Sequence, residues 1–233
     1  FRSVLGCAAH FGLRRVNAVD VLPPYHVSGF MARVRCAVTG GEYRPWAWKD
    51  LEAGRRPALP AGDWVISLVP TQLQRLLKDQ GATEWLRRFR AVFIGGAALW
   101  PELAEAAATA RLPLAPSYGM TETAAMVTAL LPEEFLAGRR SNGRVLPHAA
   151  ISVNDAGLVT IAAESLFRGY WPASRTESTF VTEDLGGLDA DGHLHLLGRR
   201  DAVINSGGKK VHPEVVEAAL RASGEFEIGR AHV

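Results

Sequence analysis

The sequence has few cysteines, little net charge and no long apolar run. Its 233 residues include two cysteines, Cys7 and Cys36, too few for a disulfide framework and without metal-ligand spacing, which favours a reducing, cytoplasmic location. The 26 basic and 24 acidic residues give a formal charge of +2, so no strong field favours nucleic acid or a membrane surface. Apolar runs such as 64–69 end long before the roughly 20 residues of a membrane-spanning helix.

Internal repeats, long linkers and low-complexity segments are also absent from the sequence. Apolar residues make up 48% of the chain and charged residues 21%, which is enough apolar material for a sizeable core. The basic residues are dispersed and do not alternate with aromatic ones, so nucleic-acid binding has no support. We expect a globular protein without a membrane span, and the sequence leaves a homo-oligomer open.

The two ends of the chain differ from ordinary protein termini. Residues 1–6 lack an initiator methionine and lack the basic, apolar and small-residue pattern of a signal peptide. Residues 227–233 fit nothing before them and resemble the translation of a sequencing-library adapter. We therefore expect a fragment that is truncated at both ends and carries a non-native tail.

Between residues 16 and 116, short apolar runs alternate with helix-length segments, which is typical of parallel βαβ units. Helices are predicted over 71–78, with leucines on one face, and over 101–110, with proline in the first turn. The strands predicted in this part are 18–22, 65–68, 91–94 and 112–115. The predicted fold class is α/β, with this parallel part belonging to a large N-terminal domain.

After about Pro147 the pattern changes to shorter strands, predicted at 150–153, 158–162 and 193–197. Turns that combine Asp or Asn with Gly connect them, at 154–157 and 189–192, and predict hairpins. A smaller antiparallel β subdomain therefore follows the α/β part. The expected division is a partial α/β core, a β-rich subdomain, the start of a C-terminal α+β domain and the tail, at 1–147, 148–200, 201–226 and 227–233.

The densest polar segment is Ser-Tyr-Gly-Met-Thr-Glu-Thr at 117–123, directly after the last predicted parallel strand. Open α/β sheets bind ligands at the carboxyl ends of their strands. Hydroxyl and carboxylate oxygens on such a turn suit phosphate groups and Mg²⁺, which is a hard cation. The alternative, which spacing alone favours, is that Thr121 and Thr123 cap a helix that continues through 124–127.

Other segments suit a ligand but also have ordinary explanations. Residues 95–97 let a flat ring approach the backbone, or form a plain strand-to-helix turn. Arg199 offers a guanidinium to a phosphate or ribose, or faces water. His26 is a loop histidine or a catalytic one, and Asp184 binds a sugar diol or belongs to a turn.

His193 and His195 stand two apart on a predicted strand, so they share one face. From the sequence we predict that no third type of metal-binding residue clusters near these two histidines. Spacing alone therefore does not favour a metal site at this pair.

Five segments, taken in chain order, resemble motifs of the adenylate-forming family, which includes acyl-CoA synthetases, luciferases and peptide-synthetase adenylation domains. They are similar to its aromatic-pocket, adenine-contacting, adenylate, ribose-binding and hinge motifs, and they are 23–29, 95–97, 117–123, 182–184 and 198–201. The resemblance covers about 22–220. Five matches in the family's order make coincidence a poor explanation.

The resemblance implies a site for ATP and Mg²⁺. Tyr118 would stack on adenine, Thr121 would hold the adenylate phosphate, and Glu122 would bind Mg²⁺; the last two would be catalytic. Asp184 would accept hydrogen bonds from the ribose hydroxyls, with Arg199 beside it. The remaining residues of the implied nucleotide site are Gly95, Gly96, Ala97, Ser117 and Gly119.

The resemblance also implies sites for the acid and for CoA. His26 and Ser28 would line the acyl pocket, with Thr71 as a further candidate. His26 would be catalytic as well, near the path by which CoA reaches the acyl-adenylate. Gly207 and Gly208 would border the route of the pantetheine arm.

Asp201 would be the hinge about which a small C-terminal domain rotates between adenylation and thioester formation. The family's phosphate-binding loop would precede Phe1 and its adenylation lysine would follow Leu220, so we expect the fragment to be inactive alone. Residues 205–210 depart from the family, in which an acidic residue and Asn often follow the glycines. The departure bears on CoA handling and not on the family.

Within the family, three stretches resemble the o-succinylbenzoate-CoA ligases of menaquinone and phylloquinone biosynthesis; they are 67–77, 94–98 and 164–171. Two other stretches, 114–123 and 135–138, are most similar to the cyanobacterial branch of these ligases. The implied reaction joins an aromatic carboxylic acid to AMP as an acyl-adenylate, and the CoA thiol then displaces AMP. Two alternatives stay open: another aryl- or acyl-CoA ligase of the family, and a non-catalytic nucleotide-binding module.

Overall fold

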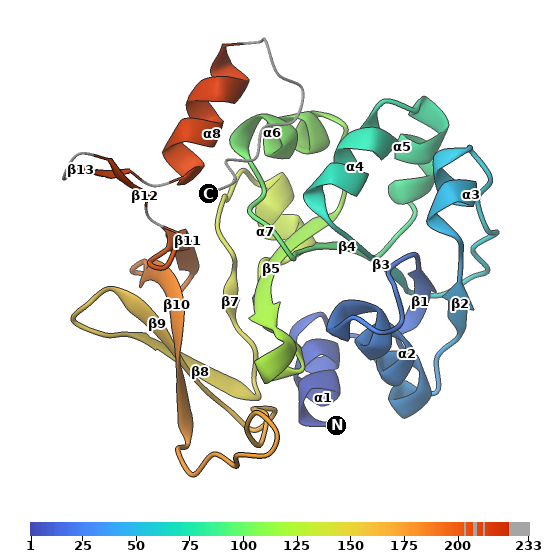
Figure 1. Cartoon of the computed structure of the whole chain (residues 1–233). Helices are drawn as coiled ribbons and strands as arrows, with labels where there is room; N and C mark the ends of the chain where they lie inside the picture. Colours follow the sequence, from blue (N-terminus) through green and yellow to red (C-terminus); the bar gives the residue numbers. More distant parts are fainter. Residues whose placement is uncertain (203, 207–208, 212, 224–233) are drawn as a thin grey trace.

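A seven-stranded sheet forms the centre of the computed structural model, which describes residues 1–202, 204–206, 209–211 and 213–223. Its strand order is β2-β1-β3-β4-β5-β6-β7 (Figure 1). The strands are β1 (Asn17–Asp20), β2 (Tyr43–Pro45), β3 (Trp64–Leu68), β4 (Ala91–Ile94), β5 (Leu114–Met120), β6 (Ala125–Ala129) and β7 (Arg144–Val145). Strands β1 to β5 are parallel, whereas β6 is antiparallel to both of its neighbours. The α/β prediction is confirmed.

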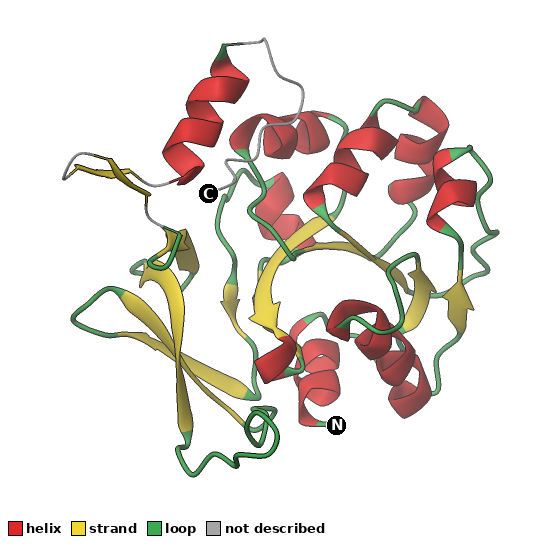
Figure 2. Cartoon of the chain, viewed as in Figure 1, coloured by secondary structure: helices red, strands yellow, loops and turns green. Residues whose placement is uncertain are grey.

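Helices cover both faces of this sheet (Figure 2). One face packs against α1 (Arg2–His10) and α2 (Val27–Thr39). The helices on the other face are α3 (Trp48–Glu52), α4 (Pro70–Leu77), α5 (Gln80–Leu86), α6 (Pro101–Thr109) and α7 (Pro132–Leu136). Alternate strand residues serve the two cores: Val92 and Ile94 face the α4 side, while Ala91 and Phe93 face the α2 side.

A second, antiparallel sheet follows, with the strand order β11-β10-β9-β8. Its strands are β8 (Ala149–Val153), β9 (Leu158–Ala163), β10 (Thr179–Leu188) and β11 (Leu194–Arg199). The turns at 154–157 and 189–192 connect neighbouring strands, as predicted. The last described elements are β12 (Ile204–Ser206), β13 (Lys209–Val211) and α8 (Pro213–Ala222).

The polar segment 117–123 differs from its prediction. Its first part belongs to β5 and pairs antiparallel with β6, and only η1, the single 3₁₀ turn Thr121–Thr123, lies outside the strands. The helix proposed over 124–127 is wrong. Ala124 has a φ of 52°, which ends the turn in the left-handed region, and β6 begins at Ala125.

Several sequence predictions concern parts that the structure does not test. The domain boundaries stay predictions, and Gly207, Gly208 and the tail 227–233 lie outside the described residues. Within the described ranges, none of the helices combines the length and the apolar character needed to cross a bilayer.

Candidate functional site

Four predicted segments lie at one edge of the central sheet because parallel strands end on the same side. His26 follows β1, Thr71 follows β3, Gly95 follows β4, and the adenylate-like segment ends β5 (Figure 1). The β4 and β5 segments touch: a Cβ on Gly95 would lie 3.3 Å from Ser117 Oγ. Topology thus brings to one edge residues as far apart in the sequence as His26 and Thr123, which are 97 positions apart.

Tyr118 connects this edge to the second sheet. Its phenol donates a hydrogen bond to Asp184 Oδ2 at 2.6 Å, and Arg199 Nη1 lies 3.4 Å from the other oxygen, Asp184 Oδ1. Burial, followed by the bond to Asp184, raises the pKa of Tyr118, so its hydroxyl stays protonated and donates. The structure therefore joins three of the predicted nucleotide-binding residues in one contact chain.

Arg199 also forms a bidentate ion pair with Asp201, the predicted hinge residue. The Nε atom lies 2.8 Å from Oδ1 and Nη2 lies 2.6 Å from Oδ2. This guanidinium lowers the pKa of the Asp201 carboxyl. Asp184 and Asp201 thus share one cation across the end of β11, which links the predicted ribose acid to the predicted hinge.

The turn η1 is held from inside by Thr123. This side chain is buried, its Oγ1 donates to Ala125 O at 2.6 Å and accepts from the backbone N–H of Met120 at 3.0 Å. Thr121, by contrast, is exposed and Glu122 is half-buried. Thr123 therefore stabilises the turn, whereas Thr121 and Glu122, the predicted catalytic residues, are accessible to a ligand.

Gly119 allows β6 to approach this turn. A Cβ there would lie 2.1 Å from Ala125 O and 2.6 Å from Met126 Cα. The register of the β5–β6 pair shifts between Tyr118 and Gly119, so the small residue stands where the two strands come closest. Gly119 therefore has a role in strand pairing, besides the role in the nucleotide site that the resemblance implies.

The loop 164–175 adds contacts that the sequence analysis missed. Ser165 Oγ donates to Thr123 O at 2.7 Å, the N–H of Phe167 donates to Glu122 O at 2.8 Å, and the Tyr170 phenol donates to Glu122 Oε1 at 2.6 Å. The feature of this loop that the sequence shows is a cluster of aromatic residues between two strands. The spacing of these residues does not indicate that the loop contacts the turn 121–123.

The predicted acyl-pocket residues lie at the starts of two helices. His26 is exposed at the N-cap of α2 and makes no side-chain cap bond, while Ser28 is half-buried in the first turn. Thr71 is half-buried in the first turn of α4. Within the described ranges no hydrogen bond joins these three side chains to one another, so their grouping stays a prediction.

Arg35 is a candidate that the sequence analysis missed. It lies on α2, is 2% exposed, and its Nε has no hydrogen-bond partner. Its guanidinium lies 5.7 Å from the centre of the Phe93 ring, and no ion pair joins it to another described side chain. The nearby charge of Arg35 offsets part of the rise that burial causes in the pKa of Asp20, so Arg35 has an opposite charge in its neighbourhood. Its buried Nε still has no hydrogen-bond acceptor, and Arg35 therefore marks a place that suits an anionic ligand.

Comparison with known proteins decides the family. The family model described as "AMP-binding enzyme" matches residues 10–171. The chain belongs to the AMP-binding enzyme family. A 2-succinylbenzoate–CoA ligase of Geobacillus kaustophilus is 30% identical to this chain in an alignment of 243 positions that covers 97% of this chain and 49% of that protein.

Solved structures agree with this AMP-binding fold. The O-succinylbenzoate coenzyme A synthetase (MenE) of Bacillus subtilis, in complex with ATP and magnesium ion, matches with a TM-score of 0.80 and 25% identity, over 97% of this chain and 50% of that one. The Escherichia coli MenE with a bound analogue of OSB-AMS matches at 0.73 and 30% identity, over 97% and 50%. The chain spans about half the length of the curated relatives it matches.

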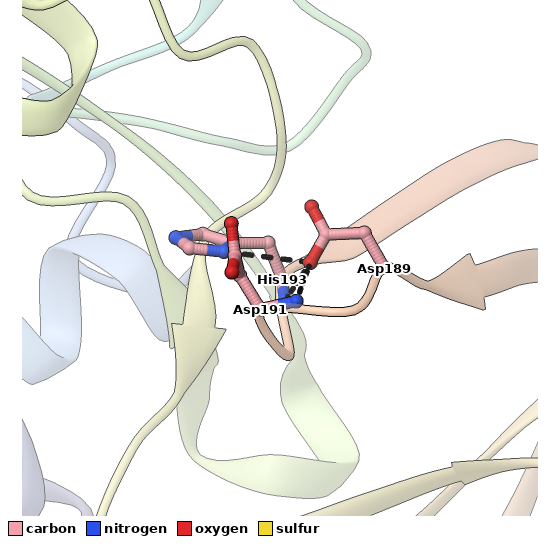
Figure 3. Close-up of side chains that lie close together, drawn as sticks. All are labelled: Asp189, Asp191 and His193. Atoms are coloured by element: carbon pink, nitrogen blue, oxygen red, sulfur yellow. Dashed lines mark hydrogen bonds and ion pairs between the residues drawn. The ribbon is translucent and has the colours of Figure 1, made fainter.

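A polar cluster joins the second sheet of this AMP-binding enzyme to its core. Asp189, Asp191 and His193 place ligand-type atoms within 4.8 Å of one another (Figure 3), so acids do cluster beside the histidine pair, contrary to the expectation. However, Arg139 Nη2 lies 2.7 Å from Asp191 Oδ2, and its Nη1 lies 3.4 Å from Asp189 Oδ2. One guanidinium thus contacts both carboxylates and offsets part of their negative charge.

This cluster also holds the β10–β11 hairpin in place. The buried His193 has its Nε2 3.1 Å from Glu134 Oε1 of α7. Next to it, the N–H of Leu194 donates to Gly143 O at 2.9 Å. Because the hairpin carries Asp184 and Arg199, these contacts fix the position of the predicted ribose site relative to Tyr118.

A hollow of about 370 Å³ lies at the carboxyl ends of β1 and β2. Asp20 and Tyr43 line it, together with Trp46 and Trp48. The first two residues of the predicted aromatic-pocket motif, Pro23 and Pro24, also line it, whereas His26, Ser28 and Thr71 do not. The Tyr43 phenol donates to Asp20 Oδ2 at 2.8 Å, and burial raises the pKa of Asp20. The hollow is separate from the Tyr118–Asp184 contact.

Proposed function

We propose that this protein is an AMP-forming acid–CoA ligase that converts o-succinylbenzoate to its CoA thioester in menaquinone or phylloquinone biosynthesis. The observation that carries the proposal is the meeting of Tyr118 on β5 with Asp184 on β10. An aromatic ring and a diol-binding carboxylate at the carboxyl edge of a parallel sheet suit a nucleoside. The names of the relatives support the choice of acid.

The nucleotide is bound by residues from both sheets. The Tyr118 ring stacks on adenine, and Gly95, Gly96 and Ala97 let the base lie against the backbone. Asp184 keeps lone pairs for the ribose hydroxyls, since Tyr118 uses one of them and Arg199 lies at 3.4 Å. The exposed Thr121 donates a hydrogen bond from its hydroxyl to the phosphate.

Glu122 suits Mg²⁺ because it offers hard carboxylate oxygens on an accessible turn. Within the described part of the chain, Tyr170 is the only side chain that hydrogen-bonds this carboxylate, and it uses Oε1 alone. When bound, a magnesium ion would neutralise negative charge on the ATP phosphates during adenylation. The contribution of the protein here is to hold the carboxylate in position.

The acid lies against α2. His26 and Ser28 are in the first part of this helix, with Thr71 on α4 as the further pocket residue. o-Succinylbenzoate carries a second carboxylate besides the one that reacts, and Arg35 on the same helix is a buried cation whose Nε has no hydrogen-bond partner. Pairing between the two gives this buried donor an acceptor.

The CoA half-reaction rests on the resemblance. Asp201 acts as the hinge, and its ion pair with Arg199 connects the hinge to the ribose acid. The resemblance alone assigns Gly207 and Gly208 to the pantetheine route, since both lie outside the described residues. We place the reaction in the cytoplasm, which agrees with two buried cysteines that are free thiols.

The experiment uses the full-length product of the gene that encodes this chain. CoA-thioester formation with ATP and Mg²⁺ is compared for o-succinylbenzoate, benzoate, coumarate and a medium-chain fatty acid. Strong preference for o-succinylbenzoate is expected. Preference for another acid would retain the family but replace the substrate, and no turnover of any acid would favour a non-catalytic nucleotide-binding module.

Arg35→Gln tests the pocket, with Arg33→Gln as its matched control because Arg33 is exposed on the same helix. We expect Arg35→Gln to raise the KM for o-succinylbenzoate about thirtyfold or more, because loss of one partner of a buried charged contact costs about 2 kcal/mol or more. The KM for ATP stays unchanged in both variants. Equal effects of the two substitutions would contradict the assignment.

A further inference from the structure

Tyr170 makes an unusual contact for a side chain on the surface. It is 64% exposed, yet its phenol donates to Glu122 Oε1 at 2.6 Å across 48 residues of sequence. Such an exposed ring contributes little to the core, since most of its apolar area stays in water. The stability of the fold therefore gives no strong reason for this side chain to point at Glu122.

The loop that carries Tyr170 is organised around this contact. The Phe167 ring meets the Tyr170 ring edge-on, with centroids 4.8 Å apart, and the Arg175 guanidinium lies 5.0 Å from the centre of the Phe167 ring. Phe167 is itself tied to the turn, because its N–H donates to Glu122 O at 2.8 Å. The ring is thus held on one side, and its hydroxyl is aimed at one carboxylate oxygen.

A glutamate carboxylate rotates over a broad range of its last torsion angle when nothing holds it. A donor on one oxygen restricts this rotation and leaves the second oxygen free for another partner. Carboxylates that bind metal ions are commonly oriented by such outer hydrogen bonds, and loss of the outer partner weakens metal binding. Tyr170 and Glu122 have the geometry of such a pair.

We propose that Tyr170 is a positioning residue that orients the Glu122 carboxylate toward the magnesium ion of the nucleotide. The proposal rests on the proposed function, because it takes Glu122 as the residue that binds the ion. Tyr170 bonds Oε1, and Oε2 is presented to the ion. The Tyr170 hydroxyl is the donor in this bond, because a carboxylate oxygen only accepts.

The test compares Tyr170→Phe with Tyr43→Phe in the full-length gene product. The two substitutions remove the same chemical group, because Tyr43 also donates its phenol to a carboxylate, that of Asp20 at 2.8 Å. Binding of Mn²⁺ to the ATP-loaded protein is measured by electron paramagnetic resonance. Tyr170→Phe should weaken Mn²⁺ binding about tenfold, while Tyr43→Phe leaves it unchanged and binding of metal-free ATP stays the same in both.

A double-substitution cycle separates positioning from a general loss of structure. In a Glu122→Gln background, Tyr170→Phe should cause no further loss of Mn²⁺ binding, because the two residues act as one unit. Unchanged Mn²⁺ binding in Tyr170→Phe, or equal losses in Tyr170→Phe and Tyr43→Phe, would overturn the proposal. Failure of the wild-type protein to form any CoA thioester would instead refute the proposed function, and the metal-binding comparison would still decide the role of Tyr170.

Discussion

Replacing Tyr118 by phenylalanine removes a single hydroxyl group that joins the two sheets. Tyr118 is 8% exposed, and its phenol donates to Asp184 Oδ2 at 2.6 Å. The phenylalanine ring keeps the same shape, so the packing against Val127 and Ile161 is retained. The substitution therefore isolates the hydrogen bond from the apolar contacts around it.

The expected loss can be derived from the surroundings of the carboxylate. A hydrogen bond to a charged group contributes about 1.5–3 kcal/mol. The Asp184 side chain is 14% exposed, so water replaces the lost partner poorly, but Arg199 at 3.4 Å remains close to the other oxygen. We expect the lower end of this range, about 1.5 kcal/mol, which lowers the thermal midpoint by roughly 3–6 °C for a protein of this size.

The assay is urea denaturation followed by tryptophan fluorescence, together with a thermal melt. Tyr25→Phe is the control, because Tyr25 is 83% exposed and its phenol makes no hydrogen bond to any described residue; it should change the free energy of unfolding by less than about 0.5 kcal/mol. If Tyr118→Phe lies within about 0.5 kcal/mol of Tyr25→Phe, the contact between the sheets does not contribute as argued.

Two further predictions concern the fold around the site. His148 is 6% exposed and neither ring nitrogen has a hydrogen-bond partner; burial lowers its pKa below the ordinary 6.5. The unfolded chain therefore binds more protons below about pH 6.5, so stability is fully present above that pH and falls below it. His148→Leu should reduce this slope in urea titrations between about pH 5 and about pH 8, and an unchanged slope would argue against the buried neutral ring. Gly143 has a φ of 79°, and a Cβ there would lie 1.8 Å from the carbonyl carbon of Ala129. Gly143→Ala should destabilise the protein by about 3 kcal/mol or more, whereas Gly12→Ala, with a φ of 64° and open space, should cost about 1 kcal/mol; similar losses in urea denaturation would refute the steric argument.

The parallel sheet could be predicted because most of its central strands are compact apolar runs. The segment 91–94 is buried at every position, and 65–68 is buried at every position except Ser67, and burial on both faces favours apolar residues. The segment 117–123 was harder to predict, since its first part becomes a strand only by pairing with β6. Its own residues equally suit the start of a helix, and a partner strand decided the outcome.

The sequence alone determined the α/β class, the order of the motifs and the types of chemical group at the site, because apolar periodicity and motif spacing are local properties of the chain. Tertiary structure alone decided that Tyr118 meets Asp184, that the buried Arg35 keeps an Nε without a hydrogen-bond partner, and that Tyr170 bonds Glu122. These contacts join residues on different elements. The physical reason is that burial and hydrogen bonding between distant residues depend on how the two sheets and the loop pack, which no local pattern specifies.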